Sequence, residues 1–161
     1  MRDLILNFRG NYKMRAVVQR VKSASVSISD QIVGECEIGA LILVCAMKDD
    51  TVSQVEKLAK KITKIRIYQD ENHKMNRSLM DINGAALVIS QFTLAADLKR
   101  GNRPGFSEAA EPEKAKHLYS HFVSCLKQNG ISTQTGEFGS EMAVKLTNDG
   151  PVTICLDSDQ F

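Results

Sequence analysis

The sequence predicts an α+β fold: a single domain with a mixed or antiparallel β-sheet, or half-barrel, and two main helices packed on one side. The chain has 161 residues and is 43% hydrophobic, which suits one domain with a buried core. Strand-like segments heavily outnumber the two helical segments. The helices interrupt the strands without the regular alternation that a parallel α/β sheet requires.

The first half of the chain predicts an antiparallel meander followed by a helix. Alternating, β-branched residues at 15–28 indicate a strand or a bent pair of strands, with a turn at Asp30-Gln31. Residues 32–36 and 40–47 predict two more strands, and the second is apolar on both faces and therefore central. Asp50-Thr51 begins an amphipathic helix with lysines on its polar side. Its apolar positions recur at helical spacing: Val55, Leu58, Ala59, Ile62 and Ile65.

The second half predicts another helix between strands. A polar loop at 69–78 leads to an apolar strand at 85–94. Pro112 opens a helix whose C-terminal end is marked by Asn129-Gly130. Short strands near 131–137, 142–147 and 152–156 complete the domain.

Composition limits the classes of protein that fit. The chain has 21 basic and 19 acidic residues, a net charge of +2, far below that of a protein that holds long nucleic acid by its phosphates. Any RNA contact is therefore expected to be local. No run approaches the roughly 18 apolar residues of a membrane span, and residues 1–13 lack a secretory signal pattern. We expect a cytoplasmic, soluble protein with an N-terminal extension at 1–13 and one domain at 14–161.

The usual catalytic and metal-binding signatures are missing. His117 and His121 lie four positions apart on the second helix, but a helical projection turns both away from the apolar stripe, and His73 lies in a polar loop. We expect exposed histidines, no metal and no other cofactor. The cysteines lack the short spacing of a zinc or redox site, which predicts reduced structural thiols. They are Cys36, Cys45, Cys125 and Cys155.

The segment Ser90-Gln91-Phe92-Thr93 adds polar groups to the end of an apolar strand. Regular alternation places Ser90 and Phe92 on one face and Gln91 and Thr93 on the other. A hydroxyl beside an aromatic ring suits the edge of a pocket. A strand that leaves the core with its serine bonded to the backbone also explains this segment.

The dipeptide Gly150-Pro151 lies between two strand-like stretches. An X-Pro bond can be cis at modest cost, and a rigid Gly-Pro turn projects carbonyls that cannot rotate away. An ordinary turn is the simpler interpretation of a lone Gly-Pro.

Taken together, six segments in order resemble the D-aminoacyl-tRNA deacylase family over nearly the whole chain from Met14. The segments are residues 14–21, 74–78, 90–94, 101–104, 135–139 and 148–154. The resemblance implies the deacylase fold and hydrolysis of the ester that joins a D-amino acid to the 3′ end of transfer RNA. It also implies a homodimer in which the Gly150-Pro151 bond is cis and each subunit inserts this dipeptide into the other's active site. Its carbonyls would exclude an L side chain and admit glycine as well as D-amino acids.

The resemblance also implies roles for individual residues. Arg20 would brace the Gly150-Pro151 loop, and Ser90 and Phe92 would line the aminoacyl site. Phe138 and Met142 would flank the terminal adenine, and an aromatic ring and a thioether suit the face of a base. The charged loop formed by Lys99, Arg100 and Arg103 can meet acceptor-stem phosphates, although solvated turn charge explains it as well.

Two questions stay open at this level. Thr93 can be a nucleophile that forms an acyl-enzyme, or backbone groups, a water and the ribose 2′-hydroxyl can suffice; we favour the second because no base is evident beside Thr93. The alternatives for function are a non-catalytic module that binds the acceptor end of RNA and a related deacylase of L-alanyl-tRNA. The D-specific form of both signatures argues against the second alternative.

Overall fold

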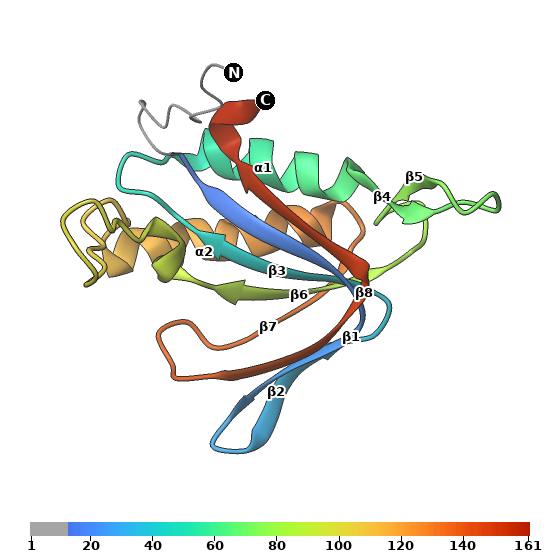
Figure 1. Ribbon diagram of the computed structural model, residues 1–161, viewed down its shortest axis with the longest axis horizontal. Helices are drawn as coiled ribbons and strands as arrows, with labels where there is room; N and C mark the ends of the chain where they lie inside the picture. Colours follow the sequence, from blue (N-terminus) through green and yellow to red (C-terminus); the bar gives the residue numbers. More distant parts are fainter. Residues whose placement is uncertain (1–12) are drawn as a thin grey trace.

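The computed structural model describes residues 13–161 (Figure 1). Six strands form a curved, mixed sheet whose central strand is β1 (Arg15–Ile28). The strands that pair with β1 are all antiparallel to it: β2 (Gln31–Cys36), β3 (Gly39–Cys45) and β8 (Ala143–Asp157). On the far side of β3, parallel pairing adds β6 (Ala85–Ser90) and then β7 (Ser132–Thr135). This arrangement confirms the predicted half-barrel, because the sheet curls toward itself at the end that holds β2, β7 and β8 (Figure 1).

The two helices lie on the same side of the sheet, as predicted (Figure 1). Helix α1 (Val52–Lys64) begins after Thr51, which forms a reciprocal capping box with Gln54. Helix α2 (Pro112–Gln128) has a proline in its first turn, and Asn129 is its C-cap. Both helix starts and the end of α2 agree with the sequence signals.

Two apolar clusters cover the two faces of the sheet. On the helix side, Ala40, Ile42 and Val44 of β3 pack in one cluster with the buried faces of α1 and α2. On the other side, Leu41 of β3 and Leu87 of β6 pack with residues from the second half of β1. Strand β3 is buried on both faces, as its unbroken apolar run predicted.

The predicted meander is wrong, because β2 and β3 both pair with β1 and not with each other. Strand β1 is long enough to pair with β3 over residues 15–21 and with β2 over residues 24–28. Its pairing with β8 shifts register between these two halves. Two partners therefore share one edge of β1 in succession.

Three further elements differ from the sequence prediction. The polar segment 69–78 contains most of a small hairpin, β4 (Arg66–Gln69) and β5 (Met75–Ser78). The two expected terminal strands are a single strand, β8. The chain then ends with a short 3-10 helix, η2 (Ser158–Gln160).

The predicted extension at 1–13 lies almost wholly outside the described residues. Within residues 13–161, no helix is long and apolar enough to cross a membrane.

Candidate active site

A cavity of about 580 Å³ opens where the parallel strands β3 and β6 end. Parallel strands present their carboxyl ends at the same edge, where α/β sheets commonly bind ligands. The second helix and the loop before β8 complete the walls. The lining residues used below are Met14, Cys45, Ser90, Gln91, Phe92, Phe106, Glu111, Tyr119, Phe138 and Met142. Five of the residues predicted for the site, Ser90, Gln91, Phe92, Phe138 and Met142, therefore come together.

Strand β6 ends at Ser90, four residues earlier than predicted. The Gln91 N–H still donates to the Val44 carbonyl oxygen (2.8 Å), and the chain then turns into a 3-10 helix, η1 (Phe92–Ala95). Strand alternation was predicted to place Thr93 on the face opposite Ser90 and Phe92. This prediction is wrong beyond Gln91, because Phe92 and Thr93 belong to η1 and not to a strand. Phe92 is 57% exposed and packs edge-on against Phe106, with ring centroids 5.0 Å apart.

Thr93 is exposed and does not line the cavity. Its hydroxyl accepts a hydrogen bond from the Gln91 side-chain amide. Among the hydrogen bonds of the described residues, none joins Thr93 to a histidine or lysine side chain. A threonine hydroxyl without a neighbouring base is a weak nucleophile, so the geometry favours a site in which Thr93 has no covalent role.

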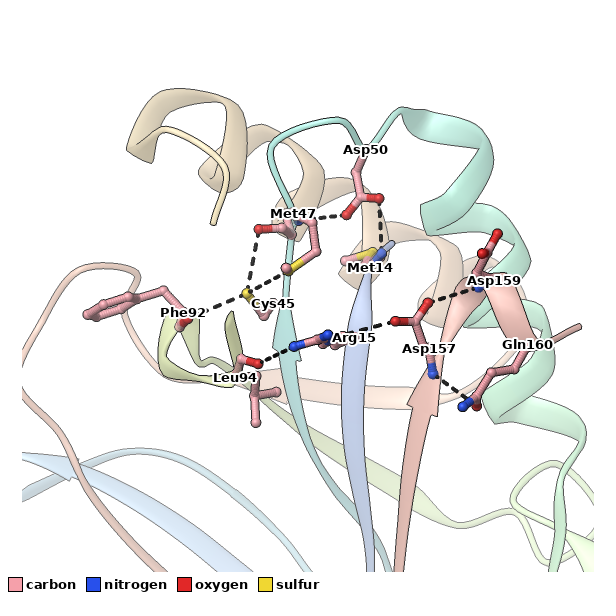
Figure 2. A network of polar contacts seen from close by, with 11 residues as sticks. Met14, Arg15, Cys45, Met47, Asp50, Phe92, Leu94, Asp157, Asp159 and Gln160 are labelled. Atoms are coloured by element: carbon pink, nitrogen blue, oxygen red, sulfur yellow. Dashed lines mark hydrogen bonds and ion pairs between the residues drawn. The ribbon is translucent and has the colours of Figure 1, made fainter. Parts of the chain in front are cut away.

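A network of polar contacts next to the cavity holds η1 in position (Figure 2). The Cys45 thiol donates to the Phe92 carbonyl oxygen (3.6 Å), and burial raises the pKa of Cys45 to about 11. Arg15 donates to the Leu94 carbonyl oxygen (2.9 Å) and contacts the Asp157 carboxylate (3.5 Å). The turn is thus tied from both of its ends to β1 and β3, which form the rigid centre of the sheet.

Tyr119 of α2, to which the sequence analysis gave no role in the site, supports the Phe138 wall. Its hydroxyl donates to the Val88 carbonyl oxygen (2.9 Å), and its ring lies 5.8 Å from that of Phe138. Burial raises the pKa of Tyr119 to about 12, so the hydroxyl keeps its proton. The helical spacing of apolar residues gave no sign that Tyr119 reaches the end of a strand on the sheet.

The cavity has few ionisable lining groups. Its ionisable lining groups are Cys45, Glu111 and Tyr119, and the first and third have raised pKa values. Within residues 13–161, no cluster of three or more potential metal-ligating side chains is present. His117 is exposed, as predicted, whereas His121 is half-buried and contacts Glu56 of α1 (3.2 Å). Apart from the carboxyl group of Glu111, the cavity offers apolar contact and neutral hydrogen bonding.

Gly150 and Pro151 lie elsewhere, on the exposed bend of β8, and neither lines the cavity. The peptide bond between them is cis. Gly150 has a φ of +129°, and a Cβ added there would lie 2.7 Å from a terminal nitrogen of Arg20. Only glycine fits this position without displacing Arg20.

Arg20 holds the bend from below. It is only 6% exposed, and its Nε donates to the Asp149 carbonyl oxygen (2.9 Å) while Nη1 donates to the Ile67 carbonyl oxygen (2.6 Å). Its guanidinium also contacts the Asp149 carboxylate (3.4 Å). Asn148 adds a second clamp, because its amide bonds to both the N–H and the carbonyl of Val152 (3.0 Å each). The bend therefore projects into solvent while Arg20 and Asn148 hold its backbone in position.

The charged loop after η1 is exposed at Lys99, Arg100 and Arg103. Two backbone hydrogen bonds between Asp97 and Gly105 close its base (2.8 and 2.9 Å). All four cysteines are free thiols; Cys155 is exposed and the other three are buried.

Comparisons with known proteins agree on one family. Residues 17–157 match the family model described as D-Tyr-tRNA(Tyr) deacylase. A D-aminoacyl-tRNA deacylase from Jannaschia sp. (strain CCS1) is 58% identical over 145 residues, which cover 90% of this chain and 99% of the relative. One from Cereibacter sphaeroides (strain ATCC 17029 / ATH 2.4.9) is 56% identical over 145 residues, which cover 90% of this chain and 100% of the relative.

Two solved structures share the fold. The c-Myc DNA Unwinding Element Binding Protein superposes with a TM-score of 0.84 at 36% identity, over 88% of this chain and 97% of the other. A probable eukaryotic D-amino acid tRNA deacylase superposes with a TM-score of 0.78, over 89% of this chain and 98% of the other. The second is 15% identical and therefore supports the fold alone.

Proposed function

This chain belongs to the D-Tyr-tRNA(Tyr) deacylase family, and we propose that it hydrolyses the ester bond of D-aminoacyl-tRNA, releasing the free D-amino acid and the tRNA. The observation that carries the proposal is the cavity, which gathers Ser90, Phe92, Phe138 and Met142 at one edge of the sheet. Its volume of about 580 Å³ falls within the usual range for a small-molecule site. That space suits a terminal adenosine with its aminoacyl group.

Within the cavity, two walls contact different parts of the substrate. Ser90 and Phe92 line the aminoacyl end, where β6 passes into η1. Phe138 and Met142 flank the adenine, with Phe138 supported from behind by Tyr119. An aromatic ring and a flexible thioether bind a base by stacking and dispersion, without hydrogen bonds that read its sequence.

The chemistry needs no covalent intermediate. The exposed Thr93 has no base beside it, and the nearby thiol of Cys45 keeps its proton. Backbone groups at the turn after Ser90 orient the ester and a water, and the 2′-hydroxyl of the terminal ribose assists. An aminoacyl ester is intrinsically labile, so positioning and fixed dipoles supply enough of the barrier reduction.

Selectivity comes from exclusion by a second subunit. In a homodimer, Gly150 and Pro151 of one subunit enter the partner's cavity, and their carbonyls crowd the side of the Cα where an L side chain projects. Two observations support this arrangement: the dipeptide is exposed and braced by Arg20, and it is absent from the walls of its own chain's cavity. A filter of this kind rejects L-amino acids by a clash and accepts D-amino acids and glycine.

The charge of the chain argues against a protein that holds long nucleic acid by its phosphates. The net charge of +2 is small, and the charged loop at Lys99, Arg100 and Arg103 suits a few phosphates of an acceptor stem. We place the enzyme in the cytoplasm, where its tRNA substrates are made.

The test is deacylation of matched substrates by the purified protein. D-Tyr-tRNA and Gly-tRNA should lose their amino acids at enzyme-dependent rates, while L-Tyr-tRNA and L-Ala-tRNA should decay at the spontaneous rate. Binding of all four substrates without turnover would favour a non-catalytic module. Preferential cleavage of L-Ala-tRNA would identify the related L-specific deacylase.

A further inference from the structure

Asp50 is a carboxylate buried almost completely, in the loop between β3 and α1. It is 1% exposed, and its two oxygens accept the backbone N–H groups of Met14 (2.9 Å) and Met47 (2.6 Å) (Figure 2). Burial is the main cause that raises its pKa from 3.8 to about 6. Neither the cavity chemistry nor the braced bend at Gly150 uses this residue.

Within residues 13–161, no ion pair gives the Asp50 carboxylate a close counter-charge. Two neutral amides compensate poorly for taking a full negative charge out of water. The charged groups that act on it are Lys13, which lowers its pKa, and Asp157, which raises it; Cys45 beside it is neutral.

Met14 is held in place by several contacts besides the hydrogen bond from its backbone nitrogen to Asp50. Its side chain is fully buried and lines the cavity, and its carbonyl oxygen accepts the Ser158 N–H (2.9 Å). In a chain that begins at Met14, the same nitrogen is an α-ammonium with three protons and a full positive charge. Its 2.9 Å distance to Asp50 is that of a charge-assisted hydrogen bond, the pairing that a buried carboxylate needs.

The family match and all described strands and helices lie within residues 14–161. The Cereibacter sphaeroides relative aligns over its entire length with 145 residues of this chain, and the match to the family begins at residue 17. Every strand and helix described above lies after Met14. A chain of residues 14–161 thus contains the whole fold.

We propose that Asp50 is a binding site for a free α-amino group, and that a form of this protein beginning at Met14 fills it. The buried ion pair then ties the start of β1 to the loop before α1, at the wall of the cavity. In the chain of 161 residues, a neutral peptide N–H occupies the same site.

Three chains test the proposal: residues 1–161, residues 14–161, and residues 12–161 with Tyr12→Met as the start. The third differs from the second by two residues and has no free amino group at Met14. Asp50→Asn should lower the melting temperature of 14–161 by roughly 5–10 °C, because it leaves a buried ammonium unpaired. It should lower that of the two longer chains clearly less. Equal losses in all three chains would overturn the proposal.

The pKa of Asp50, followed by NMR of its carboxyl carbon, gives a readout that needs no variant of Asp50. It should lie near 6 in the two longer chains and well below that in 14–161. In the longer chains the folded pKa is raised above the unfolded value of 3.8, so the folded state binds the extra proton and stability falls as pH rises from about 4 to about 6. That fall should disappear in 14–161. Titration near 6 in all three chains would refute an ion pair with the α-amino group.

Discussion

The cavity at the ends of β3 and β6 and the bend of β8 differ in almost every physical respect. The cavity is concave and largely apolar, and its groups with raised pKa values keep their protons. The bend is exposed, and a buried guanidinium and an asparagine amide hold it from beneath. One region accepts a ligand; the other projects rigid backbone outward. Each carries half of the selectivity that we propose, so neither is complete within one chain.

Arg20→Ala should have the largest effect on stability and on the discrimination between D- and L-Tyr-tRNA. The change removes the donor to the carbonyl oxygens of Ile67 and Asp149, and it leaves those groups without that partner in a buried setting. The unfolding free energy should fall by about 3 kcal/mol. In the folded fraction, discrimination between D- and L-Tyr-tRNA should weaken because the bend is no longer braced. Chemical denaturation and paired deacylation assays measure the two effects.

The control is Lys22→Ala, an exposed position two residues further along β1. It should change neither stability nor discrimination measurably. If Arg20→Ala destabilises the protein but leaves D/L discrimination intact, the bend does not need its brace, and the contrast between the two regions has no role in selectivity.

Thr93→Ala should have the smallest effect, measured as the rate of deacylation. Its hydroxyl is exposed and bonded only to the Gln91 amide among the described contacts, so its loss should lower deacylation of D-Tyr-tRNA less than about threefold. Single-turnover rates are the measurement. A loss of about a thousandfold would make Thr93 the nucleophile and give the cavity a reactive side chain that the geometry does not indicate.

The sequence was most informative where local signals decide structure. Thr51, Pro112 and Asn129 marked the helix boundaries, and the unbroken apolar run of β3 indicated burial on both faces. Order within the sheet could not be obtained in this way. The two halves of β1 have different partners, and that choice depends on contacts far apart in the chain.

The candidate site was predicted only in part for a similar reason. Resemblance to a family supplied its residues, whereas strand alternation gave the wrong geometry for Phe92 and Thr93, because β6 ends at Ser90. No periodicity distinguishes Tyr119 from the other apolar residues of α2, although its ring contact with Phe138 gives it a part in the cavity wall. Asp50 was taken only as a helix-start signal, since sequence does not show which nitrogen a buried carboxylate will meet.

The most direct test of the central claim uses mixed dimers of two inactive or unselective variants. Ser90→Phe fills the cavity but keeps the bend, and Gly150→Ala disturbs the bend but keeps the cavity. If the bend serves the partner's cavity, each hybrid dimer contains one intact site and should recover about half of the wild-type D-selective rate. Hybrids that recover no selective activity, despite forming stable dimers, would contradict a filter supplied across the subunit boundary.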